Sequence, residues 1–326
     1  MTAPDEAVPW LTDRRVSWLA EVASWIAERL GVDMDVDALE TVKQRPWGAV
    51  LRVRATASGV TFFKAVGPQG RHETTLLADL AASGTHLAPA VIAVDLERGW
   101  LLMLDHGKEI SRETLDLQVS VIETLLPEYA ELQRTTSDRT DRWIAAGVTD
   151  RTPRRLPPLL DELLAGKGRS GPLPVEAEEI ARFAELLDVF AEVCDVLADG
   201  PVPMAIDHAD IHGTNVLLGN SRPRLIDWGD SCIGHPFSSL LVPVEWVAGR
   251  LDRHDRAHAT ERLAAAYLEP WGSAADRGTL GTRFGLATSP APSATTSNPV
   301  VAHQRMQRTL SARSSHCFAR GSESTP

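Results

Sequence analysis

The segment that most constrains this chain is Ala205–Asp230, AIDHADIHGTNVLLGNSRPRLIDWGD, in which two short apolar runs flank a cluster of turn-forming residues. The runs are VLL and RLI, and the cluster between them is GNSRP, so the pattern predicts a β-hairpin. With Leu218 opposite Arg224, Asn215 stands opposite Asp227, and directly opposed residues have Cβ atoms about 5 Å apart. We therefore expect an amide and a carboxylate side by side at the open end of the hairpin.

The loop that enters this hairpin carries a second carboxylate, Asp210, five residues before Asn215. Two hard oxygen ligands, with room left for water and phosphate, suit Mg²⁺, which makes Asn215 and Asp227 candidate metal ligands. Asp210 lies where a base that accepts a hydroxyl proton is needed. The segment therefore indicates Mg²⁺-assisted chemistry on a hydroxyl group.

The motif HADIHGTN matches the H-x-D-x-x-x-x-N catalytic loop of protein-kinase-like folds. It most resembles the HGDLHPGN form of aminoglycoside phosphotransferases and their small-molecule kinase relatives, and LIDWGD is similar to the magnesium-binding segment of that family. The resemblance implies that Asp210 is the catalytic base and that Asn215 and Asp227 hold Mg²⁺. It also implies that His208 braces the loop and that His212 lies near the γ-phosphate, where it either contacts phosphate or packs.

The first hundred residues contain the two charged residues that such a fold needs to hold ATP. VTFFKAV places Lys64 on a predicted strand, and RHETTLL places Glu73 early in the following helix. The resemblance implies that Lys64 binds the α- and β-phosphates and that Glu73 orients it. Taken alone, Lys64 is also compatible with an exposed strand lysine, and Glu73 with an acid favoured by the helix dipole.

Two further segments occupy nucleotide-binding positions by the same resemblance. QRPWGAVLRV stands where the nucleotide-covering loop belongs, with Trp47 beside a single glycine, Gly48, that allows close approach of the backbone to phosphate. LLMLDHG stands where the hinge between lobes belongs. Backbone groups around Leu104 and Asp105 are expected to meet the adenine edges, with Met103 lining the pocket or belonging to the core.

Hydrophobic periodicity along the rest of the chain is that of an α+β protein. It predicts helices at 10–30, 71–84, 115–136, 159–164, 178–199, 237–251 and 253–267, a hairpin over 49–66, and strands at 89–95 and 99–107. We therefore expect a two-lobed, protein-kinase-like fold with an antiparallel sheet and a helix in the N-lobe, and a mostly helical C-lobe that carries the catalytic hairpin.

The predicted domains are a nucleotide-binding lobe with a leading helix at 1–105, a helical lobe with the catalytic loop at 106–284, and a tail at 285–326. The tail is rich in Ser, Thr and Pro and lacks sustained apolar periodicity, which is typical of disorder. The composition changes abruptly at its start. Since the family continues with apolar helices here, we interpret the tail as an altered or frame-shifted C-terminus.

Charge and cysteine content limit the partners and the compartment. The formal net charge of −11 at pH 7 disfavours nucleic acid, which binds basic patches, and fits a cationic small molecule as well as a surface made soluble by acids. The N-terminus is acidic rather than basic, and no apolar run reaches membrane-spanning length. The three cysteines are scattered without metal-binding spacing. We expect a cytoplasmic protein without membrane or nucleic-acid partners.

The predicted function is transfer of the γ-phosphoryl group of ATP, with Mg²⁺, to a hydroxyl of an aminoglycoside-, amino-sugar- or choline-like molecule. Two departures from the family pattern are Ala209, where glycine is usual, and Ser239, where an aspartate commonly ties the next helix to the catalytic loop. One alternative is a nucleotide-binding pseudo-kinase that has lost its acceptor site. The other is a metal-dependent hydrolase, because His208, Asp210 and His212 form an H-x-D-x-H pattern.

Overall fold

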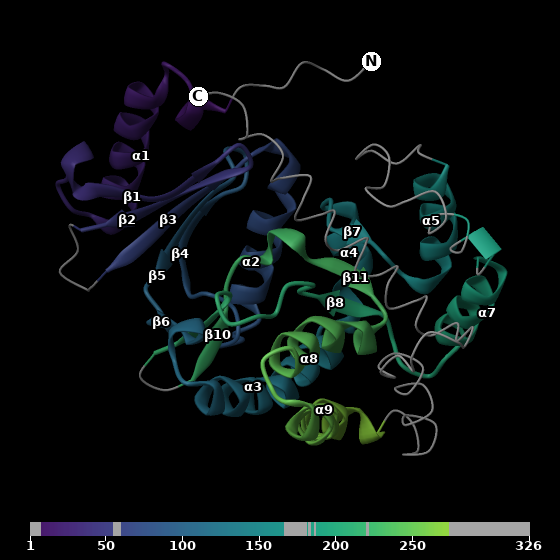
Figure 1. Cartoon of the computed structure of the whole chain (residues 1–326). Helices are drawn as coiled ribbons and strands as arrows, with labels where there is room; N and C mark the ends of the chain where they lie inside the picture. The colour runs from purple at the N-terminus through teal and green to yellow at the C-terminus, as the bar shows by residue number, and fades with distance from the viewer. Residues whose placement is uncertain are drawn as a thin grey trace. The chain divides into compact units, whose positions relative to one another are not determined.

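The computed structural model describes residues 8–54, 60–165, 181, 184–185, 187–219 and 222–273 (Figure 1). Its described residues divide into two compact units, which are treated separately below. In the described part of the chain, unit 1 covers residues up to Lys108 and Leu217–Gly229, and unit 2 covers Glu109–Val216 and the residues from Asp230 to Ser273. The segment Leu217–Gly229 was expected to belong with the helical lobe but clusters with unit 1.

Unit 1 is built on one five-stranded antiparallel sheet with the strand order β1-β2-β3-β5-β4. Its strands are β1 (Leu39–Arg45), β2 (Gly48–Val53), β3 (Thr61–Val66), β4 (Val91–Asp95) and β5 (Trp100–Leu104). The strands predicted from β-rich runs are confirmed. The turn between β2 and β3, predicted around Ala57–Gly59, lies outside the described residues.

Helix α1 (Arg15–Leu30) packs against one face of this sheet (Figure 1). The aromatic ring of Phe63 on β3 lies 6.0 Å from Trp25 and 5.5 Å from Trp100, both edge to face. Edge-to-face packing of such large rings adds to the free energy gained by burying their surface. As predicted, the helix ends at Leu30, and Gly31 follows with a φ of +64°, which glycine adopts without steric cost.

Strand β1 was not predicted, because its sequence LETVKQR shows neither alternation nor a high β-propensity. It pairs with β2 through a two-residue connection, Pro46 and Trp47, so the segment expected to be a nucleotide-covering loop is a tight hairpin. The pairing contains a β-bulge between Thr41 and Lys43. A bulge inserts one residue and so changes the face to which the following side chains point.

The other face of the sheet carries Lys64, which bonds to Glu73 on α2 (His72–Ala82). The predicted apolar side of this helix is buried through Leu76, Leu77 and Leu80. Hydrophobic burial of one helix stripe therefore holds the first turn of α2 against the sheet face opposite α1.

Unit 2 is mostly helical. Among its described residues, the α-helices are α3 (Leu115–Thr135), α4 (Thr140–Ala145), α5 (Leu156–Leu164), α7 (Leu187–Ala198), α8 (Leu241–Ala248) and α9 (Arg253–Leu268). A small sheet joins β7 (Thr149–Asp150), β11 (Cys232–Gly234) and β8 (Ala205–Asp207) in the order β7-β11-β8. Helix α3 continues through Pro127 and matches the helix predicted over 115–136.

The predicted hairpin consists of β9 (Val216–Leu218) and β10 (Pro223–Leu225), neighbours in a three-stranded sheet with β6 (Lys108–Glu109). The turn residues Asn220 and Ser221 and the predicted tail at 285–326 lie outside the described residues. The register of the hairpin therefore stays a prediction. Among the residues that are described, no helix is both long and apolar enough to cross a membrane.

Candidate active site

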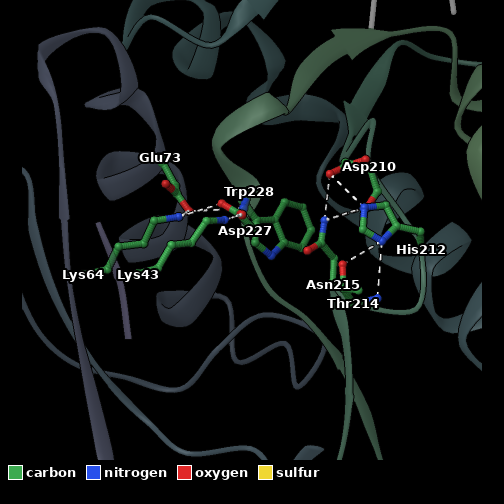
Figure 2. A network of polar contacts seen from close by, with 9 residues as sticks. All are labelled: Lys43, Lys64, Glu73, Asp210, His212, Thr214, Asn215, Asp227 and Trp228. Atoms are coloured by element: carbon green, nitrogen blue, oxygen red, sulfur yellow. Dashed lines mark hydrogen bonds and ion pairs between the residues drawn. The ribbon is translucent and has the colours of Figure 1, made fainter. Parts of the chain in front are cut away.

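The predicted nucleotide-binding charges of unit 1 form one compact cluster (Figure 2). The Nζ atom of Lys64 donates to Oε1 of Glu73 at 2.6 Å and to Oδ1 of Asp227 at 2.8 Å. Lys64 and Glu73 expose only 14% and 3% of their side chains, whereas Asp227 exposes 43%. The lysine therefore lies between two carboxylates, of which Asp227 is the more exposed.

Opposite charge decides the protonation state of Lys64. Burial alone lowers the pKa of this ammonium group, but the facing carboxylates of Asp227 and Glu73 outweigh burial and raise the pKa above its usual value. Lys64 is therefore positively charged throughout the physiological pH range. A permanently charged lysine that is held in a fixed place is suited to neutralising a phosphate chain.

Helix α2 also fixes the backbone beside Asp227. Oε1 of Glu73 accepts the N–H of Trp228 at 3.1 Å, and Nε2 of His72 lies 2.8 Å from the carbonyl oxygen of Gly229. Asp227 itself has a φ of +64°, a region that aspartate enters more readily than most residues other than glycine. A strained backbone conformation persists only where the surrounding structure holds it in place. At Asp227 it is held by the side chains of His72 and Glu73, which bond the backbone of the next two residues.

The predicted catalytic loop in unit 2 forms a second cluster (Figure 2). Nδ2 of Asn215 donates to the backbone oxygen of Asp210 at 3.0 Å and to its Oδ2 at 2.8 Å. This use of the amide nitrogen orients Asn215 and leaves its side-chain oxygen as the atom that can bind a cation. Asn215 is 7% exposed, while the side chain of Asp210 is 31% exposed. The candidate base is thus accessible and its positioning amide is buried.

The ring of His212 is oriented by the residue two positions later. Its Nδ1 accepts the backbone N–H of Thr214 at 3.3 Å and lies 3.0 Å from the Thr214 hydroxyl. Because an N–H can only donate, this contact assigns the ring proton of a neutral imidazole to Nε2. Nε2 lies 3.2 Å from Oδ2 of Asp210, so the ring donates to the candidate base rather than accepting from it.

A buried network of hydroxyl, amide and backbone groups supports the catalytic loop. The Tyr129 hydroxyl accepts the N–H of His208 at 2.8 Å, and Nε2 of Gln133 donates to the carbonyl oxygen of Ile206 at 2.7 Å. Gln133 also donates to the Ser239 hydroxyl at 2.9 Å and accepts from Tyr267 at 2.5 Å. Burial raises the pKa of both tyrosine hydroxyls well above the usual value, so both keep their protons.

This network includes residues that sequence reasoning missed. Tyr129 and Gln133 lie one turn apart on α3, and helical periodicity alone gives neither residue a place in the site. Ser239 replaces the aspartate expected to tie the next helix to the loop, and its hydroxyl makes that connection through Gln133. His208 is fully buried with its backbone bonded to Tyr129, which is compatible with the bracing role implied by the family resemblance.

Ala209 has a φ of +63°, so the alanine that replaces the usual glycine occupies a left-handed conformation. The carboxylate of Asp207 accepts the N–H of Ala209 at 2.8 Å and helps to hold this turn. An alanine here costs roughly 1 kcal/mol relative to a residue without Cβ strain. The strain lies one residue before Asp210.

The remaining predicted nucleotide-binding residues lie in unit 1. A Cβ on Gly48 would lie 3.0 Å from the carbonyl oxygen of Ala65, so this glycine permits close approach of β2 to β3. The half-buried Trp47 accepts the N–H of Gly67 through its carbonyl oxygen at 2.8 Å. These contacts shape the hairpin turn without requiring a nucleotide.

The hinge segment LLMLDHG follows β5. The backbone N–H groups of Leu104 and Asp105 already donate to the carbonyl oxygens of Ala90 and Val60, at 3.0 and 3.1 Å. Contacts to adenine edges are therefore expected from other backbone groups of this segment. Met103 is half-buried on the sheet face that carries Lys64, because it is opposite Phe62, two residues before that lysine.

The two predicted metal ligands belong to different units, Asn215 to unit 2 and Asp227 to unit 1. Each fits Mg²⁺ by its chemistry, since the Asn215 amide and the Asp227 carboxylate both carry the hard oxygen atoms that this ion prefers. Within the described part of the chain, no three His, Cys, Asp or Glu side chains gather into a metal site of their own.

Comparisons with known proteins identify the family and the fold. A sequence model described as the phosphotransferase enzyme family matches residues 41–279. No curated protein has a sequence that matches this chain. Solved structures do match, and the neighbours are kinase-like, which confirms the predicted α+β, two-lobed, protein-kinase-like fold.

Three of these structures show which kinds of protein the chain resembles in fold. Macrolide 2'-phosphotransferase MphH from Brachybacterium faecium superposes with a TM-score of 0.56 at 15% identity, covering 95% of this chain and 99% of that protein. Choline kinase from Cryptosporidium parvum gives 0.58 at 11% identity, covering 92% and 93%. A thermostable mutant of the aminoglycoside phosphotransferase APH(4)-Ia, in complex with AMP-PNP and hygromycin B, gives 0.55 at 13% identity, covering 93% and 99%.

Proposed function

Because the chain belongs to the phosphotransferase enzyme family, we propose that it transfers the γ-phosphoryl group of ATP to a hydroxyl group of a small molecule. The single observation that carries this proposal is the enclosed Lys64–Glu73–Asp227 cluster, which reproduces the charges that a kinase-like fold uses to hold phosphate. ATP as the donor is supported by the AMP-PNP complex of the similar aminoglycoside phosphotransferase.

Unit 1 supplies the groups for the nucleotide in this proposal. Lys64 neutralises charge on the phosphate chain, and Glu73 keeps its ammonium group in place. Trp47, Gly48 and the hinge residues Met103, Leu104 and Asp105 line the nucleotide-binding region. Asn215 and Asp227 are the residues that would hold Mg²⁺, which when bound would neutralise charge on the phosphates.

Unit 2 supplies the groups for the acceptor hydroxyl. Asp210 accepts the hydroxyl proton as the acceptor oxygen bonds to the γ-phosphorus, and the bond to the β-phosphate oxygen breaks to release ADP. Asn215 keeps the Asp210 carboxylate oriented through its amide nitrogen. His212 donates from Nε2 to the same carboxylate, and His208 braces the loop from the buried side. The contribution of the chain is thus position and charge.

The proposed acceptor class is supported by the similar structures, which include a macrolide phosphotransferase, an aminoglycoside phosphotransferase and a choline kinase. We propose an acceptor that carries both a hydroxyl and an amine, because amines are cationic at neutral pH and the chain has a net charge of −11. The negative charge favours association with a cation over association with an anion.

A coupled assay of ATP consumption tests the proposal. Purified full-length protein with Mg²⁺ is screened against aminoglycosides, macrolides, amino sugars, amino alcohols and homoserine, and hits are checked by mass spectrometry for the phosphorylated acceptor. We expect phosphate transfer to at least one class, with none when Mg²⁺ is chelated. Binding of ATP without transfer to any acceptor would instead indicate a pseudo-kinase, and acceptor hydrolysis without ATP would indicate a hydrolase.

A further inference from the structure

A second lysine, Lys43 on β1, lies beside the same carboxylate as Lys64 (Figure 2). Its Nζ is 3.8 Å from Oδ2 of Asp227, while the Nζ of Lys64 is 2.8 Å from Oδ1. The two oxygens of one carboxylate thus face two different lysines. Lys43 has no role in the sequence-based predictions or in the function proposed above.

The β-bulge in β1 accounts for this position. Thr41 is opposite Leu51, and after the bulge Lys43 is opposite Val50, which in turn is opposite Lys64 on β3. Directly opposed residues on neighbouring antiparallel strands point to the same face of a sheet. Lys43 and Lys64 therefore lie in one cross-strand row, on the face away from α1.

A regular strand would place Lys43 elsewhere. Without the extra residue Lys43 would be opposite Ala49, which belongs to the hydrophobic cluster between the sheet and α1. The next residue shows the alternation, because Gln44 points to that side and donates to the carbonyl oxygen of Trp10. The bulge thus directs one charge away from an apolar core and toward Asp227.

The two lysines differ in how firmly they are bound. Lys64 is largely buried and bonded to two carboxylates, whereas 49% of the Lys43 side chain is exposed and its contact with Asp227 is long. An exposed ion pair of this kind contributes little free energy, so Lys43 can leave Asp227 at small cost. A nucleoside triphosphate would bring more negative charge to this row than Lys64 alone can balance.

From this geometry we infer that Lys43 is a phosphate-binding residue, which contacts the phosphate chain of the nucleotide beside Lys64 and releases Asp227 to its cation ligand. The inference rests on the proposed function, since it assumes that a nucleoside triphosphate binds to unit 1. Strand β1 would thus take a direct part in binding the nucleotide. The affinity for ATP would depend on both lysines of the cross-strand row, Lys43 and Lys64.

Calorimetric titration of the full-length protein with ATP and with adenosine, both with Mg²⁺, tests the inference. We expect Lys43→Met to weaken ATP binding about tenfold, because one charged contact is lost, and to leave adenosine binding unchanged. Lys43→Arg keeps the charge and is expected to bind ATP within about twofold of wild type. Arg29→Met is the matched control, because Arg29 is an exposed cation on α1, across the sheet.

The outcomes separate the two claims. If wild type binds ATP and Lys43→Met binds it equally or more tightly, the inference on Lys43 is wrong and the proposed function stands. An equal loss of ATP and adenosine affinity would mean that Lys43 only shapes the strand, and would also overturn the inference. If wild type does not bind ATP, the proposed function fails and the inference fails with it.

Discussion

The two clusters are positioned by different kinds of force. In unit 1 opposite charges hold Lys64 between Glu73 and Asp227. In unit 2 the loop with Asp210 is held by buried hydrogen bonds from the hydroxyl of Tyr129 and the amide of Gln133 to the backbone. Charged partners can be exchanged for the charges of a ligand, whereas neutral hydrogen bonds fix geometry without adding charge. The difference matches a binding role for the first cluster and a positioning role for the second.

Removing the central cation should have the largest effect on stability. Lys64→Met leaves Glu73 buried without its cation, and we expect a loss of about 3 kcal/mol in the free energy of unfolding together with the loss of ATP binding. Denaturant titration and calorimetry measure the two effects. The double variant Lys64→Met/Glu73→Leu should recover most of the stability but no ATP binding. A single variant as stable as wild type would contradict the view that charge holds this cluster.

The neutral network should respond differently. Tyr129→Phe leaves the buried N–H of His208 without its acceptor, so we expect a loss of roughly 1–3 kcal/mol in unfolding free energy. In the active enzyme kcat should fall while the Kd for ATP is unchanged, because unit 1 is not altered. Thr124→Val, which removes an exposed hydroxyl from the same helix, is the control. Weaker ATP binding by Tyr129→Phe would break the distinction between the two clusters.

The pH dependence of the unfolding free energy tests whether His106, in unit 1, is held neutral. Burial, with Arg224 nearby, lowers the pKa of His106 to about 4, and its Nε2 accepts the N–H of Ala90 at 2.8 Å. The unfolded state, with a pKa near 6.5, binds more protons between about pH 4 and 6.5, so stability should rise with pH across this window and be complete above it. After allowance for solvent screening we expect a change on the order of 1 kcal/mol.

The histidine contribution is isolated by comparing wild type with His106→Gln, which keeps an acceptor but does not titrate. Unfolding free energies at pH 4.5 and 7 should differ less in the variant than in wild type. Identical pH dependence in the two proteins would mean that His106 is not held neutral in unit 1.

The smallest expected effect is relief of strain in the catalytic loop. Ala209→Gly should stabilise the protein by up to about 1 kcal/mol, since glycine adopts the φ of +63° without cost from a Cβ. Ala257→Gly, in the exposed face of α9, should instead destabilise by about 1 kcal/mol. Thermal melts of both variants measure the difference, and a destabilised Ala209→Gly would show that the alanine methyl makes a contact of its own.

Much of the fold could be predicted because its elements follow the periodicity of burial. Helix α1, helix α2 and strands β2 to β5 each show the expected pattern of apolar residues. Strand β1 could not be predicted, since its side chains are mostly polar and exposed and its bulge breaks alternation. The family resemblance is confirmed by the sequence model that matches residues 41–279.

The residues of the candidate site could be predicted only where they belong to a sequence motif. Spacing drew attention to Asp210, Asn215 and Asp227, and resemblance added Lys64 and Glu73. The partners of the loop come from residues far away in the chain, as with Tyr129 and Ser239, and no local pattern connects them. Lys43 was hidden for a related reason, because the face to which it points depends on one inserted residue in the pairing of two strands.

The most direct test of the account separates binding from transfer in one variant. Asp210→Ala removes the candidate base in unit 2 and leaves the charged cluster of unit 1 intact. With an acceptor identified by the screen and Mg²⁺ present, we measure formation of the phosphorylated acceptor and, by calorimetry, the Kd for ATP. The account predicts that transfer falls at least about a hundredfold while ATP binds as in wild type. Turnover at the wild-type rate would contradict it.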